Sequence, residues 1–403
     1  QVVKCSCAQT ATTKPLEGVT MKNIIIAHGG APTAVINASL AGAIECARTL
    51  GFDGKILAPK FGSKGILNEQ FIDLTDISDF QLQLLKHTPG SAIGTSRHPL
   101  EEADYRRMVE ILDKNNVGYV LFTGGNGSMD TLGNIYKYSD GRFLCGGIPK
   151  TIDNDIAVTD HAPGFASCAR YMAQTVRDCA QDVMGLPIHV SVIEAMGRNA
   201  GWLTASACLA RQNRDDAPHL LYMPEVAFDE DKFLDEVLQM HRKYGGVIVV
   251  ASEGLKYKDG TPIVKPTLTV GRAVYYGDVS VHLANLILSR LNIKSRSEKP
   301  GLICRCSSAL VSETDRNEAV LMGATATQAV LQNKTGVMAG IERISSQPYS
   351  IRPILIPIEQ VMMTESMMPK HFINDSGNGV TDAFVKWLTP LVGELSTPIT
   401  FLK

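Results

Sequence analysis

The sequence has no long hydrophobic run. None of its apolar stretches approaches the ~20 residues that a membrane-spanning helix needs, although hydrophobic residues fill 44% of the 403 positions. The first residues also lack the basic and then apolar layout of a secretory signal. Charged residues make up 20%, an ordinary share for a globular chain. We therefore expect a cytoplasmic protein without a membrane partner.

An excess of positive charge is missing as well. Lysine and arginine total 39 and aspartate and glutamate total 41, which gives a formal net charge of -2. The basic residues are scattered along the chain, whereas proteins that bind nucleic acid gather them on one surface. We expect no nucleic-acid partner.

Zinc-type cysteine spacing is also absent. Among nine cysteines, two Cys-x-Cys pairs stand out, Cys5/Cys7 and Cys304/Cys306, but neither has a second pair at the spacing of a zinc site. Most other cysteines lie in apolar segments and are expected to pack as small buried hydrophobic residues. The cysteines therefore give little support to a metal–thiolate site.

Two common nucleotide-binding motifs are missing too. The chain has no Gly-x-x-x-x-Gly-Lys-Ser/Thr loop, and no Gly-x-Gly-x-x-Gly follows its first predicted strand. These absences argue against both a P-loop fold and a dinucleotide-binding fold. Any phosphate site in this chain has to use other loops.

What the sequence does contain is an alternation of short apolar runs and longer amphipathic segments. This pattern predicts an α/β fold with mostly parallel sheets flanked by helices. The length favours two lobes with a cleft between them. We expect strands within 23–30, 117–125, 143–150, 189–197, 219–225, 245–254 and 336–343, and helices within 36–47, 228–243, 279–291 and 313–333. Residues 1–20 are polar and aperiodic, and we interpret them as a leader or cloning remnant.

Two predicted strands end in glycine turns that lead into helices. The first turn contains Gly29 and Gly30, and the second contains Gly124, Gly127 and Ser128. Glycine lets backbone N–H groups approach an anion, and the positive end of the helix dipole favours negative charge. Each turn alone is equally consistent with a tight chain reversal. Together they favour a phosphate-binding site.

The segment 149–155 follows another predicted strand and is rich in reactive groups. It contains a lysine, Lys150, a hydroxyl, Thr151, and two carboxylates two residues apart, Asp153 and Asp155. Such a set offers a general base, a second acid and two phosphate-binding groups. A surface turn rich in Asp and Asn is the alternative. The apolar strand before it and the glycine turns elsewhere favour phosphoryl transfer.

The loop PKTIDNDI at 149–156 resembles the catalytic signature of the phosphofructokinases. Further segments resemble that family in the same order along the chain: GGAPTAVINASL, GSAIGTSR, FTGGNGS, APGFASC, VIEAMGRNAGWL and ASEG. The resemblance covers about residues 22–330. It implies a two-lobed phosphofructokinase-like α/β fold, with the active site in the cleft. It further implies a glycolytic enzyme that phosphorylates the 1-hydroxyl of fructose 6-phosphate to give fructose 1,6-bisphosphate.

The family resemblance also implies a division of the chain. Residues 21–163 plus about 304–355 would form the lobe that binds the phosphoryl donor. Residues 164–303 plus about 356–403 would form the lobe that binds the sugar phosphate. Members of the family form symmetric oligomers, so the resemblance implies a homodimer or homotetramer.

The resemblance assigns the catalytic groups as follows. Asp153 is similar to the base that takes the proton of the sugar hydroxyl, and Asp155 supports it. Thr151 is expected to contact the moving phosphoryl group, and Lys150 to offer a cation to the donor. Arg97 resembles the arginine that bridges the donor and the transferred phosphate, a role that suits a planar guanidinium group. An ordinary surface ion pair is the alternative for Arg97.

The sugar phosphate is expected to bind on the other side of the cleft. The implied positions are Met196, Gly197, Arg198, Glu253, Arg296 and Arg305. Glu253 resembles the carboxylate that binds sugar hydroxyls, and the two later arginines stand where the family binds the 6-phosphate. Their surroundings, RSEKPGLICRCSS, depart from the family pattern, and exposed surface charge is the alternative for both arginines.

The donor is either inorganic pyrophosphate or ATP. The positions implied for donor binding are Gly29, Gly30, Gly127 and Ser128. Glycine at 127 is typical of ATP users, because it leaves room for the nucleoside, whereas Lys150 is typical of pyrophosphate users. The rest of the chain, especially MGRNAGW, is closer to the pyrophosphate-dependent branch. The sequence slightly favours pyrophosphate.

One position departs from the family in a way that concerns Mg²⁺. Asn126 stands where the family has an aspartate that helps to hold the metal. An amide oxygen can bind Mg²⁺, but it carries no charge for a cation that prefers carboxylates and phosphates. We expect weakened metal binding. An alternative is a weakly catalytic relative that binds sugar phosphate or nucleotide as a regulatory subunit; a different acceptor sugar is a third possibility.

Overall fold

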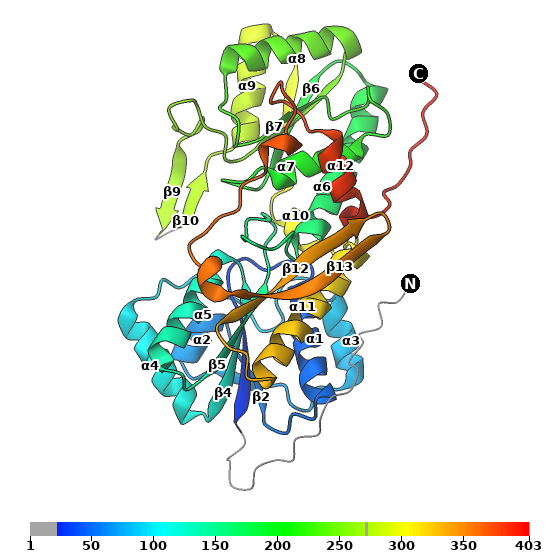
Figure 1. Cartoon of the computed structure of the whole chain (residues 1–403). Coiled ribbons are helices and arrows are strands. Elements are labelled where there is room, and N and C mark those ends of the chain that lie inside the picture. The colour runs from blue at the N-terminus through cyan, green and yellow to red at the C-terminus, as the bar shows by residue number, and fades with distance from the viewer. Residues whose placement is uncertain (1–21, 271–272, 403) are drawn as a thin grey trace.

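The computed structural model describes residues 22–270 and 273–402, which form two open β-sheets with helices on both faces (Figure 1). The predicted α/β fold is confirmed. The proposed leader at 1–20, with Cys5 and Cys7, lies outside the described residues. Within the described part of the chain, no helix combines the length and the apolar character that membrane spanning requires.

The larger sheet has seven strands in the order β13-β12-β5-β4-β1-β2-β3. Its inner pairings are parallel, and the pairs β2/β3 and β12/β13 at its two edges are antiparallel. The strands are β1 (Asn23–His28), β2 (Ile56–Pro59), β3 (Phe71–Asp73), β4 (Val117–Gly124), β5 (Leu144–Pro149), β12 (Val337–Ser346) and β13 (Tyr349–Pro357). The predicted strands at 23–30, 117–125, 143–150 and 336–343 are therefore present.

Alternation of side chains along β1 explains why this sheet is covered on both faces. Ile24 and Ile26 pack in one core with α1 (Ile36–Thr49), α3 (Asp79–His87) and α11 (Glu313–Leu331). Ile25 and Ala27 pack in a second core with α2 (Gly62–Leu67), α4 (Glu102–Lys114) and α5 (Asn126–Ser139). Successive residues of a strand point to opposite faces, so a strand that is apolar throughout has to be buried on both sides.

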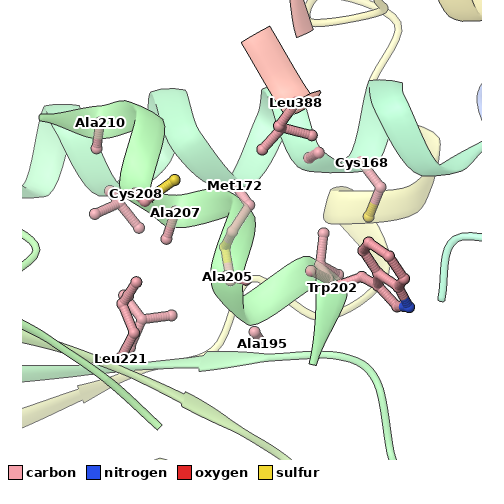
Figure 2. Close-up of a cluster of buried hydrophobic side chains, with 14 of the residues drawn as sticks. Cys168, Met172, Ala195, Trp202, Ala205, Ala207, Cys208, Ala210, Leu221 and Leu388 are labelled. Atoms are coloured by element: carbon pink, nitrogen blue, oxygen red, sulfur yellow. The ribbon is translucent and has the colours of Figure 1, made fainter. Parts of the chain in front are cut away.

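The smaller sheet has four parallel strands in the order β11-β6-β8-β7. They are β6 (Val190–Ala195), β7 (Leu220–Tyr222), β8 (Val247–Ser252) and β11 (Ser295–Glu298). One face packs on α6 (Phe165–Gly185), α7 (Trp202–Ser206) and α12 (Asp382–Val392), and the other on α8 (Glu230–Tyr244) and α9 (Val279–Leu291). Figure 2 shows part of the first of these cores, where Cys168 of α6 lies near Trp202 and Met172 of α6 points toward Ala205 of α7.

The remaining elements are short. They are the β-hairpin β9 (Pro266–Val270) and β10 (Ala273–Tyr276), the helix α10 (Leu302–Cys306), and 3-10 turns at Ala207–Ala210, Ile358–Gln360 and Lys370–Phe372. The predicted helix at 279–291 has the bounds of α9, whereas the one predicted at 228–243 begins later, at Glu230. Asp229 caps this helix by accepting the Lys232 N–H, so Phe228 lies before the helix and packs in the core.

The chain crosses between the two sheets more than once. Strands 23–149 belong to the larger sheet and strands 190–252 to the smaller one, and β12 and β13 then return to the larger sheet. In Figure 1, α11, β12, β13 and α12 meet near the junction of the two parts. The residue boundaries that the sequence suggests for the two lobes stay a prediction.

Candidate active site

The two glycine turns lie side by side at the carboxyl ends of the central strands. The Gly29 N–H donates to the Thr123 carbonyl at 2.9 Å, and the Lys150 N–H donates to the Gly124 carbonyl at 3.0 Å. A Cβ added at either Gly29 or Gly124 would overlap Ser128 Oγ, so the packing against Ser128 favours glycine at both positions. Ser128 is therefore buried against the two turns rather than open to the cleft. These contacts bring the ends of β1, β4 and β5 together.

Lys150 is a buried cation at the end of β5. Its Nζ donates to the carbonyl of Ala31 at 2.6 Å, so the end of the lysine side chain lies next to the first glycine turn. A Cβ on Gly30 would lie 3.4 Å from the same Nζ. Burial, followed by the positive charge of Arg97, lowers the pKa of Lys150 to about 8. The lysine remains a cation at neutral pH and lies beside the turn predicted to bind phosphate.

The loop after Lys150 is held by the side chain of Thr151. The Thr151 hydroxyl accepts the Asp153 N–H at 3.0 Å and donates to Asp155 Oδ1 at 2.9 Å. The side-chain amide of Asn126 donates to Asp155 Oδ2 at 3.3 Å. Asp155 thus connects the loop to the first turn of α5, and its orientation is fixed from two sides.

Asp153 carries the most perturbed carboxyl group of this loop. Burial raises its pKa first, and the negative charges of Asp155 and Glu253 raise it further. The cations of Arg198 and Lys150 oppose this rise, and the resulting pKa is about 7. A carboxylate with a pKa near neutrality, between groups from both sheets, has the properties of a general base.

The loops at the ends of β6 and β8 face the carboxylate loop from the side of the smaller sheet. Gly197 has a φ of 112°, a conformation that favours glycine. Its N–H donates to Glu253 Oε1 at 3.3 Å, and its carbonyl accepts the Ser252 hydroxyl at 2.6 Å. A Cβ at Gly197 would lie 4.0 Å from Asp153 Oδ1. The carboxyl of Asp153 therefore faces the loop that joins β6 to α7.

Comparison with known proteins identifies this arrangement of loops. The family model described as Phosphofructokinase matches residues 23–330. The chain belongs to the phosphofructokinase family. The predicted family is thereby confirmed, and the match includes both glycine turns, the carboxylate loop and the loops of the smaller sheet.

Several known proteins are similar to this chain over nearly its whole length. The pyrophosphate–fructose 6-phosphate 1-phosphotransferase of Xanthomonas campestris pv. campestris is 38% identical over 388 residues, which are 93% of this chain and 92% of that protein. The pyrophosphate-dependent phosphofructokinase of Nitrosospira multiformis has a similar crystal structure, with a TM-score of 0.86, 34% identity and 94% of each chain covered. A sulfofructose kinase of Alkalicoccus urumqiensis is 28% identical over 375 residues, which are 92% of this chain and 95% of that protein.

The two arginines predicted to bind the 6-phosphate in this chain differ in position. Arg305 on α10 is close enough to Lys150 for its charge to lower the pKa of that lysine. Arg296 is exposed on the edge strand β11, where it pairs with Ser191 of β6. Ser191 is five residues before Met196, roughly 16 Å along an extended strand. Arg305 is thus near the carboxylate loop, and Arg296 is not close to it within this chain.

Arg97 and Gly127 both border open space. Arg97 is exposed and lines a cavity of about 690 Å³, together with Lys60, Phe61 and Lys64. A Cβ added at Gly127 would meet no atom of the described residues within 4 Å. The cavity is therefore lined with cations, and there is open space next to Gly127 in the second glycine turn.

Sequence reasoning missed a segment that comes from far along the chain. Glu365 forms an isolated antiparallel bridge with Ile156, and its carboxylate accepts from the Asn199 side chain at 2.9 Å. The adjacent Ser366 N–H donates to the Asp155 carbonyl at 2.7 Å. The segment thus crosses over the carboxylate loop to the β6–α7 loop. Its composition, MMTESMMP, carries no periodic or motif signal that predicts this position.

The oxygen atoms that suit Mg²⁺ lie at the start of α5. Asn126 Oδ1 is buried and has no hydrogen-bond partner among residues 22–270 and 273–402. Because the amide nitrogen is directed to Asp155, the amide oxygen is free to accept a cation. No cluster of three or more His, Cys, Asp or Glu that could hold a metal occurs in the described part of the chain. Any Mg²⁺ here therefore has to obtain further ligands from phosphate or water.

Proposed function

We propose that this protein transfers a phosphoryl group from pyrophosphate to the 1-hydroxyl of fructose 6-phosphate, giving fructose 1,6-bisphosphate and orthophosphate. The main observation behind this proposal is the position of the Asp153 carboxyl. Lys150 lies on its donor side, and Gly197, Arg198 and Glu253 lie on its other side. Relatives named for this reaction are similar over more than nine-tenths of the chain.

Asp153 acts as the general base. Its carboxylate takes the proton of the 1-hydroxyl while the hydroxyl oxygen attacks the nearer phosphorus, and the bond from that phosphorus to the bridging oxygen breaks. A pKa of about 7 makes the carboxylate a stronger base than an ordinary aspartate and leaves it ionised above neutrality. Thr151 orients the loop through Asp153 N–H and contacts the transferred group.

The sugar phosphate binds against the loops of the smaller sheet. Glu253 accepts hydrogen bonds from sugar hydroxyls, and Met196, Gly197 and Arg198 form the adjacent wall. Arg305 binds the 6-phosphate, which its proximity to Lys150 supports. Arg296 takes part only if a neighbouring subunit brings it to the active site. We therefore also propose that the protein forms a homodimer or homotetramer. We further propose that it acts in the cytoplasm.

The donor binds between the glycine turns and the cations. Gly29 and Gly30 let backbone N–H groups approach the phosphates, and Lys150 and Arg97 neutralise their charge during transfer. A short donor with several negative charges matches two cations placed this close to the transfer point. This match favours pyrophosphate.

Mg²⁺ fits the same site. Asn126 Oδ1 and the carboxylate of Asp155 would hold it, together with phosphate oxygens of the donor. When bound, the ion would neutralise charge on the phosphoryl group that is transferred. Asn126 also orients Asp155 through its amide, a hydrogen bond that an aspartate at this position would not donate.

ATP is the second candidate donor, and one observation favours it. The cavity beside Arg97 is lined by the exposed ring of Phe61 and by Lys60 and Lys64, which together suit a nucleoside polyphosphate. The open space around Gly127 offers further room for a nucleotide next to the second glycine turn. Pyrophosphate has no ring that could stack on Phe61 in this cavity.

The test is an assay of the purified protein with Mg²⁺, fructose 6-phosphate and either donor, followed by ³¹P NMR. We expect fructose 1,6-bisphosphate and orthophosphate from pyrophosphate, with slower turnover from ATP. Faster turnover with ATP would reverse the donor assignment. Turnover of another sugar phosphate but not of fructose 6-phosphate would contradict the acceptor. The absence of turnover with both donors would support the regulatory alternative, which the uncharged Asn126 favours.

A further inference from the structure

A buried imidazole lies behind the carboxylate loop, outside the set of residues that the proposed reaction uses. His161 Nδ1 is 2.7 Å from Asp160 Oδ2, and its Nε2 is 2.6 Å from Glu318 Oε2. An imidazole between two carboxylates donates from both nitrogens only when it is protonated. Burial alone lowers the pKa of His161, but the charges and hydrogen bonds of Glu318 and Asp160 outweigh burial and raise the pKa to about 9. His161 is therefore a buried cation at neutral pH.

Three elements supply further partners of the two carboxylates. Asp160 Oδ2 accepts from Arg343 of β12 at 2.9 Å, and Asp160 Oδ1 accepts from Trp387 of α12 at 3.1 Å. Glu318 belongs to α11, and its Oε1 accepts from the hydroxyl of Tyr349 on β13. His161 and its two carboxylates thus link α11, β12, β13 and α12 at the junction of the two parts of the molecule (Figure 1).

Other charged and aromatic groups enclose the same cluster. The Arg343 guanidinium lies over the rings of Tyr349 and Trp387, 5.2 and 5.1 Å from their centroids. The edge-to-face contact between the rings of His161 and Trp387 has a centroid distance of 6.4 Å. On α11, one turn before Glu318, the Asp315 carboxylate accepts the Gly164 N–H at 2.8 Å. The cluster therefore contacts the chain at His161 and at Gly164, on either side of residues 162–163.

The segment 159–164 supports the carboxylate loop directly. The Thr151 N–H donates to the Pro163 carbonyl at 3.1 Å, and the Ala162 N–H donates to Asn154 Oδ1 at 3.1 Å. These two hydrogen bonds lie on either side of Asp153 in the sequence. Asn154 has a φ of 53°, so its backbone conformation depends on such support. The chain of contacts runs from His161 through residues 162–163 to the loop that carries Asp153.

We propose that His161 is a positioning residue for the reaction: held between Asp160 and Glu318, it fixes the segment 159–164 and thereby the position of Asp153. This inference rests on the proposed function, because Asp153 is the group whose position matters. The contribution is to geometry rather than to binding, since His161 is buried and lies behind the loop.

A purely stabilising role is the competing explanation. Buried ion pairs are a weak means of stabilisation, because the cost of removing the charges from water offsets much of their attraction. A network with four supporting elements and two hydrogen bonds to one catalytic loop is better suited to setting a position. The two explanations differ in their effect on turnover by folded protein.

The first experiment compares His161→Gln with a matched control, His219→Gln, in the full-length protein. His219 is a largely buried imidazole of the smaller sheet, where its Nδ1 accepts the Ile248 N–H at 3.1 Å. Because a misplacement of ~1 Å can cost about 10²-fold in rate, we expect kcat of His161→Gln to fall roughly 10²-fold with KM for both substrates within about threefold. We expect His219→Gln to keep kcat within about twofold of wild type. A kcat of folded His161→Gln equal to that of the control would overturn the proposal.

A second measurement needs neither a variant nor activity. Hydrogen exchange of wild-type protein between pH 7 and pH 10, corrected for the intrinsic exchange rate, reports opening of the segment 150–164. We expect its protection to fall as the pH passes about 9, where His161 loses its proton, while α9 stays protected. Protection of 150–164 that is independent of pH, or that falls together with that of α9, would contradict the proposal. An inactive wild-type protein would refute the proposed function. The exchange measurement would still decide whether the charge of His161 fixes the segment 150–164.

Discussion

The Asn126 side-chain amide donates to the carboxylate of Asp155, with Nδ2 3.3 Å from Oδ2. Because the amide nitrogen makes this contact, Asn126 Oδ1 stays buried and without a partner among the described residues. An amide here orients the neighbouring carboxylate but adds no charge. The site therefore attracts Mg²⁺ less strongly than a site with an aspartate at position 126. In return, the Asn126 amide fixes the orientation of the Asp155 carboxylate.

Asn126→Asp is expected to bind Mg²⁺ more tightly, because it adds a negative charge close to Asp155. We expect about a tenfold gain, which is a modest part of the ~4 kcal/mol available to close charges at an effective dielectric constant of ~20. Titration with Mn²⁺, followed by electron paramagnetic resonance, measures this affinity without turnover. Asn126→Ala is the control and should bind more weakly than wild type. Equal or weaker binding by Asn126→Asp would show that residue 126 does not contact the ion.

The pH dependence of kcat/KM should be bell-shaped. Asp153 has to be ionised to act as a base, so activity rises with pH through its pKa of about 7. Lys150 has to be charged to bind the donor, so activity falls as the pH exceeds its pKa of about 8. In Lys150→Arg the alkaline limb should move upward, because arginine stays protonated. An acidic limb near pH 4 would mean that the essential base is an ordinary carboxylate.

Gly127→Asp should suppress the use of ATP more than the use of pyrophosphate. The open space around Gly127 accommodates a larger side chain, but a carboxylate there repels the additional phosphate and obstructs the path of the nucleoside. Gly127→Ala is the matched control, since it adds bulk without charge and should change the donor preference little. Steady-state kinetics with both donors measure the ratio of the two kcat/KM values. A ratio that is equal in wild type and Gly127→Asp would contradict this account of the donor pocket.

Asp153→Asn should make the fold more stable even as it removes the base. The pKa of Asp153 is raised from 3.8 to about 7 by folding, so ionised Asp153 destabilises the native state, and this penalty grows as the pH rises from about 4 to about 7. A neutral amide avoids the penalty. Thermal unfolding should therefore show a larger gain in Tm over wild type at pH 8 than at pH 5. A lower Tm at pH 8 would mean that the Asp153 charge is well compensated in the native state.

Local patterns predicted much of this fold. The alternation of apolar runs predicted strands β1, β4 to β8 and β12, because strands buried on both faces are apolar throughout. The contiguous loop 149–156 and the glycine turns were found because their chemistry is encoded in adjacent residues. The start of α8 was misjudged because Phe228 continues the apolar spacing, although Asp229 provides the cap.

The parts that local patterns missed depend on contacts between distant residues. His161 and Glu318 are 157 positions apart, and no spacing rule connects them. Glu365 reaches Ile156 through an irregular segment without periodicity. Arg296 was grouped with Arg305 because both stand where the family binds the 6-phosphate, whereas β11 and α10 place them in different surroundings. Such positions are set by how the two sheets pack, which short motifs do not encode.

The most direct test of the central claim is the turnover of Asp153→Asn with pyrophosphate, fructose 6-phosphate and Mg²⁺. We predict that kcat falls by about 10²- to 10⁴-fold, the usual contribution of a general base, while circular dichroism shows an intact fold and fructose 6-phosphate still binds. A folded variant that retains near-wild-type kcat would contradict the assignment of Asp153 as the base.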